Sequence, residues 1–292
     1  MMTKIAIVAP SGTIGEEYLV GGVDALKSMG FSVDLMPHVG KEGCGVFSAP
    51  DKERAEDLYR ALTEPSIDIV LCTRGGYGAV RTLQELPQDI FKKIDDRLIV
   101  GFSDITAIHS MSALAGRVSV HGPMLKHIGE HPSSNEDIQT LLKILKGEEI
   151  SIELPSNPLS RPGKAEGTLV GGNLSILYSL RGTPADILAE PEGKILLIED
   201  LCEYNYHIDR MMQNLKYSGI LGKISGLIVG QFIDIKEGKT PFGMDVYEVI
   251  AKAMEGTNCP ILFGCPTGHD DDINLPIRIG GKCKIEGQRI TY

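Results

Sequence analysis

The sequence contains no tryptophan, no run of basic residues and no apolar run that approaches the length of a membrane span. Lysine and arginine total 29 against 39 aspartate and glutamate, which gives a formal net charge of -10 at pH 7. Nucleic-acid binding depends on clustered Lys and Arg that neutralise phosphate, so this balance argues against a nucleic-acid partner. A membrane-spanning helix needs about 20 apolar residues, so we expect no membrane partner either.

Closely spaced cysteine pairs of the C-x-x-C kind are absent as well. The cysteines are spread over both halves of the chain, at Cys44, Cys72, Cys202, Cys259, Cys265 and Cys283. The sequence reaches an apolar segment, residues 4–9, almost at once and shows no charged-then-apolar leader. We therefore expect reduced, scattered thiols rather than a disulfide framework, and a cytoplasmic protein.

What is present is the composition of a globular α/β enzyme. The chain has 292 residues, 42% of them apolar, 23% charged and 34 of them glycine, which is enough for two domains with separate cores. Apolar strand patterns at 4–9, 31–36, 67–72 and 98–101 alternate with helical patterns. Such alternation predicts parallel strands with right-handed crossovers, whose working loops lie beyond the carboxyl ends of the strands.

A change in composition marks the domain boundary. Residues 154–163 are the richest in proline and serine, so we predict an N-terminal domain over 1–153, a linker over 154–166 and a C-terminal domain over 167–292. The second domain shows strands at 194–198, 226–232 and 260–263, and ends in a small antiparallel pattern over 277–292. It is less regular than the first, which predicts a mixed β/α domain.

Ser103 stands where the strand 98–101 gives way to a helix that begins at Asp104. A serine at such a bend projects its hydroxyl beyond the sheet edge, and the next amide N–H has no partner within the helix. This geometry suits a nucleophile with an oxyanion donor beside it. The alternative is that Ser103 or Asp104 only caps the helix, since both residue types are favoured at that position.

The glycine-rich segment Arg74-Gly75-Gly76-Tyr77-Gly78 follows the strand at 67–72 and has three interpretations. It could cradle a phosphate, but it lacks the third glycine of G-x-G-x-x-G, and the chain has no G-x-x-x-x-G-K-[ST] motif. It could bring backbone N–H groups close to a reacting carbonyl, which also requires glycine. It could be an ordinary turn.

Glu199 and His269 also follow apolar strands, at the kind of position that Ser103 occupies. Glu199 is either the acid of a triad or a residue in an ion pair or cap, and Asp200 could replace it. His269 is a general base, a solvated loop residue, or a metal ligand together with Asp270–Asp272; the chain has no H-E-x-x-H motif, and we expect no metal. Two other histidines, His109 and His121, compete with it as the base.

Several motifs, in order along nearly the whole chain, resemble the LD-carboxypeptidase family of serine peptidases, which also includes the microcin C7 self-immunity proteins. They are Arg74-Gly75-Gly76-Tyr77-Gly78, Gly101-Phe102-Ser103-Asp104-Ile105-Thr106-Ala107, Gly171-Gly172-Asn173-Leu174, Ile198-Glu199-Asp200, Tyr206-His207-Ile208-Asp209-Arg210-Met211 and Gly268-His269. The resemblance implies a nucleophile at Ser103, a base at His269 and an orienting acid at Glu199. It further implies oxyanion donors at the backbone of Gly76 and Asp104, and substrate contacts at Arg74, Gly75, Tyr77 and Asn173.

The resemblance also implies the fold and the reaction. The fold would be α/β, with a flavodoxin-like N-terminal domain and a swivelling β/α C-terminal domain, in a homodimer without a cofactor. The reaction would release the terminal D-Ala from cytoplasmic muropeptide tetrapeptides, after diaminopimelate or Lys. The alternatives are cleavage of an aminoacyl-nucleotide amide, or a non-catalytic two-domain ligand-binding protein. The sequence departs from the family pattern in the acidic run Asp270–Asp272 and at Arg278, which bear on substrate contacts near His269.

Overall fold

The computed structural model describes residues 2–41, 45–94 and 97–292, and over these residues the chain forms two compact units. The first unit comprises Met1–Glu148 and Leu275–Gly280, and the second comprises Glu149–Asn274 and Gly281–Tyr292. The predicted linker, 154–166, lies inside the second unit, where its last residues begin a long strand. Cys44 lies outside the described residues, and the other five cysteines are unpaired thiols.

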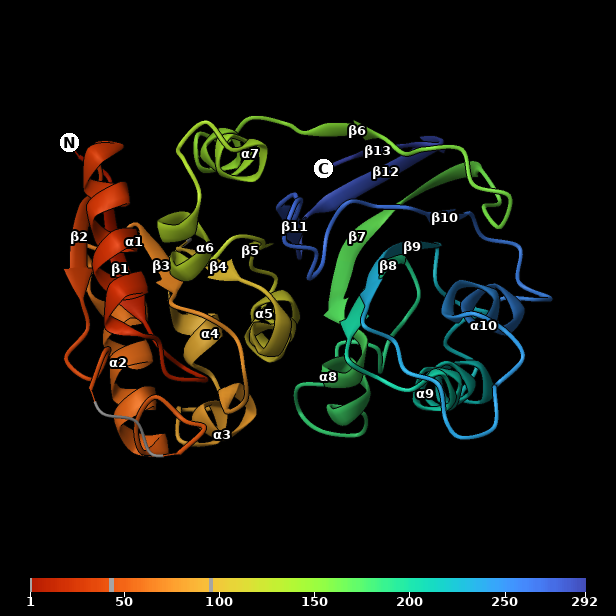
Figure 1. Cartoon of the computed structure of the whole chain (residues 1–292), viewed down its shortest axis with the longest axis horizontal. Helices are drawn as coiled ribbons and strands as arrows, with labels where there is room; N and C mark the ends of the chain where they lie inside the picture. The colour runs from red at the N-terminus through yellow and green to blue at the C-terminus, as the bar shows by residue number, and fades with distance from the viewer. Residues whose placement is uncertain (1, 42–44, 95–96) are drawn as a thin grey trace. The chain divides into compact units, whose positions relative to one another are not determined.

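The first unit alternates strand and helix, as predicted. Its elements are β1 (Lys4–Val8), α1 (Glu16–Ser28), β2 (Ser32–Leu35), α2 (Asp51–Thr63), β3 (Ile69–Cys72), α3 (Ala79–Gln84), α4 (Ile90–Lys93), β4 (Leu98–Gly101), the 3₁₀ helix η1 (Ser103–Ile105), α5 (Thr106–Leu114), β5 (Ser119–His121), α6 (Leu125–Glu130), α7 (Glu136–Leu145) and β11 (Ile277–Ile279). Over the described residues, the strand order is β11-β5-β4-β3-β1-β2, and every neighbouring pair is parallel except β11 with β5 (Figure 1).

Strands β1, β3 and β4 are almost entirely apolar because helices cover both faces of this sheet. On one face, Ile5, Leu71 and Val100 line a narrow apolar crevice together with side chains of α1, α6 and α7. Right-handed crossovers place the helices between β2 and β5 on the opposite face. The centre of the sheet is therefore buried, and the loops beyond its strands are where side chains are accessible.

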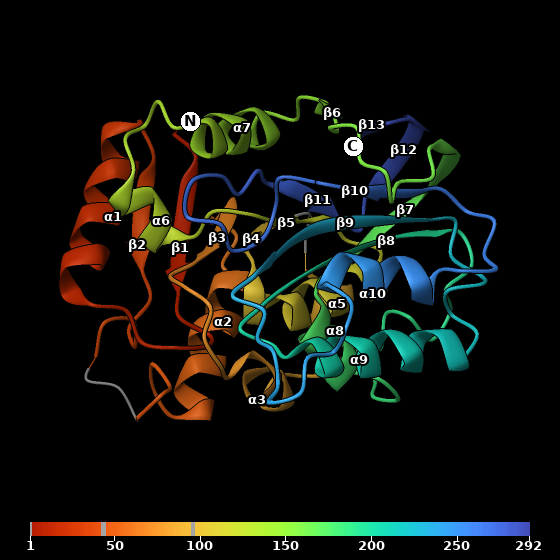
Figure 2. The ribbon, with the colours of Figure 1, turned by 45° about the vertical axis from the view of Figure 1, so that its right-hand side comes forward.

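The second unit is mixed, and the predicted α/β class is confirmed. Its elements are β6 (Ser151–Glu153), β7 (Gly163–Asn173), α8 (Leu174–Ser179), β8 (Lys194–Leu201), α9 (Asn205–Tyr217), β9 (Gly226–Ile233), α10 (Val246–Ala253), β10 (Ile261–Phe263), β12 (Lys282–Gly287) and β13 (Arg289–Thr291). Across the part of the chain described, the order is β10-β9-β8-β7-β12-β13-β6, parallel from β10 to β7 and antiparallel beyond. Helices α9 and α10 pack side by side below this sheet (Figure 2).

Two details differ from the sequence prediction. The strand predicted to end at Ile198 continues to Leu201, through a register shift in which Ile198 pairs with Val229 but Asp200 pairs with Phe232. The predicted antiparallel end is confirmed for β12 and β13, but β11 leaves it and pairs with β5 of the first sheet. The local pattern does not encode this pairing, because a three-residue strand with two apolar residues, Ile277 and Ile279, fits either sheet.

Parallel strands gather their carboxyl ends at one edge of each sheet. In the first unit, β1, β3 and β4 lead into residues 9–12, 73–78 and 102–104. In the second, β7 ends at Asn173, β8 carries Glu199 two residues before its end at Leu201, and β10 leads into the loop that carries His269. The described residues include no helix that combines the length and the apolarity needed to cross a bilayer.

Candidate active site

Ser103 adopts a left-handed backbone conformation, with φ of 63°, at the first residue of η1. A non-glycine residue pays about 1 kcal/mol or more for this conformation, and such strain concentrates at functional sites. Neither Ser103 nor Asp104 is the N-cap of the helical segment that follows the strand: Phe102 and Ile105 hold the cap positions of η1 and α5, with no side-chain cap hydrogen bond. The capping alternative is therefore wrong, and the bend presents a partly exposed serine.

Gly75 packs directly against this serine. A Cβ at position 75 would lie 2.9 Å from Ser103 Cβ and 3.0 Å from Ser103 Oγ, so no side chain fits there. The carbonyl of Gly75 accepts a hydrogen bond from the Gly12 N–H at 3.1 Å, which joins the loop after β1 to the loop after β3. Gly76 is exposed and has φ of 109°, a backbone shape that favours glycine. The glycine-rich segment is thus a close-approach loop beside the serine.

The side chain of Asp104 ties three loops together beneath the serine. Its Oδ2 accepts hydrogen bonds from Ser11 Oγ at 2.6 Å and from the Ala79 N–H at 2.8 Å. The residue is 1% exposed. Burial raises the pKa of Asp104, and the hydrogen bonds from Ser11 and Ala79 oppose that rise only in part. The carboxyl therefore fixes the turn and does not face the solvent.

Arg54, from α2, supports the same loops from below. Its guanidinium donates hydrogen bonds to the carbonyl oxygens of Pro10 and Gly78 and also pairs with Asp51. The side chain is fully buried, and a Cβ on Gly78 would lie 2.5 Å from its Nη1. A buried arginine that satisfies loop carbonyls holds those loops in one conformation. Sequence reasoning did not identify Arg54, because its only signal is a basic residue on the apolar face of a helix.

In the second unit, His269 Nδ1 lies 2.7 Å from Oε2 of Glu199. Glu199 is 0% exposed and the His269 side chain 11%. Burial lowers the pKa of His269, but the charge and hydrogen bond of Glu199, with the charge of Asp200, outweigh burial and raise the pKa overall. Because the carboxylate holds Nδ1, the ring has a fixed orientation and Nε2 is the nitrogen that can exchange a proton. Glu199 is therefore not a surface ion-pair residue, and His269 is not a solvated loop residue.

Hydrogen bonds of Gln231 hold the loop that carries His269. The sequence did not point to Gln231 either. The Gln231 N–H donates to the Thr267 carbonyl at 3.0 Å, its Nε2 donates to the Ile273 carbonyl at 2.9 Å, and its Oε1 accepts from the Asp270 N–H at 3.1 Å. One side chain thus spans both ends of the loop. Next to it, Gly230 leaves room for Glu199: a Cβ there would lie 3.2 Å from Glu199 Cβ and 2.6 Å from the Thr267 carbonyl oxygen.

Asp200 and Asn173 join the end of β8 to the start of α8. Asp200 accepts hydrogen bonds from Asn173 Nδ2 at 2.9 Å and from the Ser175 N–H at 2.8 Å, while Asn173 Oδ1 accepts from the Ile176 N–H. Burial, followed by the neighbouring charge of Glu199, raises the pKa of Asp200 to about 7. Asp200 is buried and turned to Asn173, whereas Glu199 holds the histidine, so the two adjacent acids have different tasks.

The competing histidines are part of the core. His109 is fully buried, with Nδ1 2.8 Å from Ser119 Oγ and Nε2 2.8 Å from the Gly101 carbonyl oxygen. Burial lowers the pKa of His109 to about 4, so it is neutral at physiological pH. His121, on β5, is fully buried as well. Both therefore belong to the interior of the first unit.

Two further predicted residues, Arg74 and Tyr77, are exposed on the loop after β3. Arg74 Nη1 donates to the Thr13 carbonyl at 3.3 Å, and Tyr77 is 55% exposed, with its ring 5.7 Å from that of Phe47. The structure thus brings Arg74, Gly75, Gly76, Tyr77, Ser103 and Asp104 together in the first unit. It brings Asn173, Glu199 and His269 together in the second.

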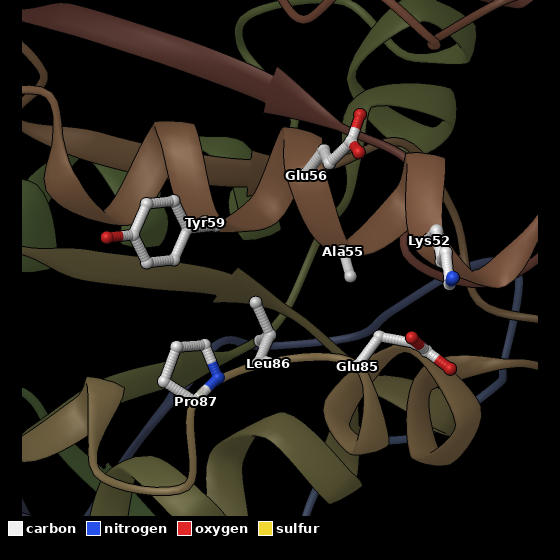
Figure 3. A pocket seen from close by; sticks show the side chains of 7 residues that line it. All are labelled: Lys52, Ala55, Glu56, Tyr59, Glu85, Leu86 and Pro87. Atoms are coloured by element: carbon white, nitrogen blue, oxygen red, sulfur yellow. The ribbon is translucent and has the colours of Figure 1, made fainter.

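A pocket away from these residues lies between α2 and the segment after α3 (Figure 3). It has a volume of about 380 Å³ and is lined by Lys52, Ala55, Glu56, Tyr59, Glu85, Leu86 and Pro87, none of which is a predicted site residue. Among the described residues, no group of three or more His, Cys, Asp or Glu side chains is placed to hold a metal ion.

Family-wide sequence comparison assigns both halves. Residues 5–122 match the LD-carboxypeptidase N-terminal domain and residues 166–285 match the LD-carboxypeptidase C-terminal domain. The chain belongs to the LD-carboxypeptidase family. A probable murein peptide carboxypeptidase of Bacillus subtilis is 32% identical over 96% of this chain and 88% of its own.

Solved structures of relatives agree with this assignment. The muramoyltetrapeptide carboxypeptidase of Oxalobacter formigenes superposes with a TM-score of 0.87, at 30% identity, over 99% of this chain and 97% of its own. The microcin C7 self-immunity protein MccF of Escherichia coli is 27% identical over 95% of this chain and 88% of its own. This LD-carboxypeptidase family member therefore resembles both proteins named as carboxypeptidases and a protein named for self-immunity.

Proposed function

We propose that this LD-carboxypeptidase family member is a serine carboxypeptidase that removes the terminal D-Ala from muropeptide tetrapeptides in the cytoplasm, during cell-wall recycling. Ser103 acts as the nucleophile, His269 as general base and acid, and Glu199 as the acid that orients the imidazole. The backbone N–H groups of Asp104 and Gly76 donate to the oxyanion. The proposal requires Ser103 Oγ to come within hydrogen-bond reach of His269 Nε2.

The steps follow the usual logic of such a triad. Ser103 Oγ attacks the carbonyl carbon of the last peptide bond while His269 Nε2 takes its proton. The resulting oxyanion is stabilised by backbone donors, each worth roughly 3–4 kcal/mol. His269 then protonates the departing amine of D-Ala, which leaves an acyl ester on Ser103. Water, deprotonated by His269, hydrolyses that ester and restores the serine.

The observation that carries the proposal is the 2.7 Å contact between Glu199 Oε2 and His269 Nδ1, which is buried and reinforced by the Gln231 clamp. A histidine held in this way contributes about 10²–10⁴-fold as an acid–base catalyst. The strained, partly exposed Ser103 supplies the matching nucleophile. A ligand-binding protein without catalysis would need neither feature.

The substrate class is supported by the names of the relatives. A murein tetrapeptide carboxypeptidase of Pseudomonas aeruginosa is 28% identical over 99% of this chain, and its name gives a murein tetrapeptide as the peptide that it acts on. The test is to incubate the protein with disaccharide-tetrapeptide and measure free D-Ala, with the same peptide ending in L-Ala as the control. We expect release of D-Ala only. No release from either peptide would overturn the carboxypeptidase proposal.

A second candidate, cleavage of an aminoacyl-nucleotide amide, is favoured by one feature of the second unit. Tyr204 and Tyr206 stack with ring centroids 5.3 Å apart, just after β8, and Arg210 lies over the Tyr206 ring at 5.7 Å. Tyr206 is 43% exposed and could stack on a nucleobase. An aminoacyl-sulfamoyl adenosine should therefore be assayed beside the tetrapeptide. Cleavage of the nucleotide amide alone would favour this candidate.

A further inference from the structure

A peptidase that removes one terminal residue must recognise the charged end of its substrate. In a peptide, the terminal carboxylate carbon is joined to the scissile carbonyl carbon by three bonds of about 1.3 to 1.5 Å each, so the two lie within about 4 Å. A carboxylate held that close to the nucleophile loses much of its hydration, and it needs a cation in compensation. A cation on a loop next to Ser103 is within reach of that carboxylate.

Arg74 stands at that place. It directly precedes Gly75, the residue that touches the Cβ and Oγ of Ser103, on the loop that also carries Gly76. Its side chain is exposed, and its guanidinium donates a long hydrogen bond, 3.3 Å, to the Thr13 carbonyl. It forms no ion pair with any residue in the described ranges 2–41, 45–94 and 97–292. Its remaining donors are therefore available to a ligand.

The neighbouring cations are already committed. Arg54 is buried and pairs with Asp51, and Arg81 pairs with the same carboxylate at 2.6 Å. Lys126 lies 3.5 Å from Glu130 and stands over the ring of Tyr18. A protein with a net charge of -10 repels a carboxylate at long range, so an uncommitted guanidinium at the site has a specific use.

We propose that Arg74 is the residue that binds the terminal carboxylate of the substrate and so restricts the enzyme to the last peptide bond. The inference rests on the proposed function, since it takes Ser103 as the nucleophile. The planar guanidinium offers two parallel N–H donors, which match the two oxygens of a carboxylate. Binding there places the scissile carbonyl over the Gly75–Gly76 backbone. A peptide that continues past the D-Ala, or ends in an amide, loses this contact.

The test compares two peptides that differ only at their end. One is the tetrapeptide with a free D-Ala carboxylate, and the other is the same peptide ending in D-alaninamide. We expect the wild-type protein to cleave the carboxylate form at a kcat/KM about 10- to 100-fold higher, the usual range for one hydrogen-bonded charge pair. We expect Arg74→Met to lose that preference by slowing only the carboxylate form, and Arg74→Lys to retain part of it.

The matched control is Lys52→Met, which removes one exposed positive charge from α2 and should leave the preference unchanged. Labelling of Ser103 by an uncharged phosphonate at the wild-type rate shows that the Arg74 variants keep a working nucleophile. An unchanged preference in Arg74→Met, with D-Ala still released, would overturn the role of Arg74 alone. Failure of the wild-type protein to cleave either peptide would instead overturn the carboxypeptidase function and this inference with it.

Discussion

Glu199 and His269 lie 70 positions apart in the sequence, yet Oε2 of the first lies 2.7 Å from Nδ1 of the second, away from solvent. Burial by itself lowers the pKa of His269, and the buried carboxylate reverses that effect. The ring is therefore more basic than an ordinary histidine and has one orientation.

The first prediction concerns pH. Because the base must be neutral to accept a proton, we expect kcat/KM to rise with pH through an apparent pKa above 6.5, the ordinary value for histidine. Glu199→Gln removes the charge but not the burial, so the apparent pKa should fall below the wild-type value, with a large loss of rate. The control is Glu53→Gln, which removes an exposed carboxylate near His38. An apparent pKa that does not move in Glu199→Gln would contradict the assigned pair.

The second prediction concerns the strain at Ser103. Both Ser103→Ala and Ser103→Gly should abolish nearly all turnover, and adding His269→Ala to either should cost little more, since a triad acts as a unit. Only glycine relieves the positive φ, so Ser103→Gly should be more stable than Ser103→Ala by about 1 kcal/mol in urea unfolding. Equal stability of the two variants would show that the bend is not strained.

The third prediction concerns the contact of Gly75 with the serine. Gly75→Ala adds a Cβ 2.9 Å from Ser103 Cβ, so the serine or the loop must move, and phosphonate labelling should slow by at least 10-fold. Gly21→Ala is the control: it lies within α1, its nearest contact is 3.6 Å, and it should raise stability by about 0.5–1 kcal/mol without affecting labelling. Labelling of Gly75→Ala at the wild-type rate would exclude this contact as a determinant of the nucleophile.

The fourth prediction tests Gln231 as a positioning residue. Gln231→Ala removes the hydrogen bonds to Asp270 and Ile273, so His269 should lose its fixed placement, and kcat should fall more than KM changes. Gln231→Glu keeps the acceptor for the Asp270 N–H but loses the donor to the Ile273 carbonyl. Its kcat should therefore lie between those of the wild-type protein and Gln231→Ala. Urea unfolding of each variant distinguishes a fall in kcat caused by the position of His269 from one caused by loss of the fold. Equal kcat in all three proteins would refute the clamp.

The fifth prediction concerns Asp200, whose pKa is about 7 in the folded protein against an ordinary 3.8. A pKa raised by folding means that its contribution to stability is complete below 3.8 and is lost as pH rises towards 7. Relative to Asp200→Asn, the wild-type free energy of unfolding should therefore decline across this window, by at most about 1.4 kcal/mol per pH unit. Asp209→Asn, at a partly exposed carboxyl, is the control. Parallel curves for wild type and Asp200→Asn would contradict the assignment.

The sequence predicted the helices and strands well where an apolar pattern repeats along the chain. The alternation of apolar strands and helices predicted the parallel first sheet, and the end of each strand pointed to Ser103, Glu199 and His269. Gln231 and Arg54 were not predictable in this way. Each acts through hydrogen bonds to backbone groups distant in sequence, and neither residue type is restricted to that use.

The sequence by itself determined the α/β class and the order of the elements, and it pointed to Ser103, Glu199 and His269 as candidate catalytic residues, because periodicity and strand ends are local properties. Only the tertiary structure decided that Glu199, and not Asp200, holds His269, and that β11 completes the first sheet after the chain has built most of the second. Both outcomes depend on which backbones and side chains meet across long separations in sequence. Burial and hydrogen bonding determine which of these long-range contacts form, and a local sequence pattern does not predict them.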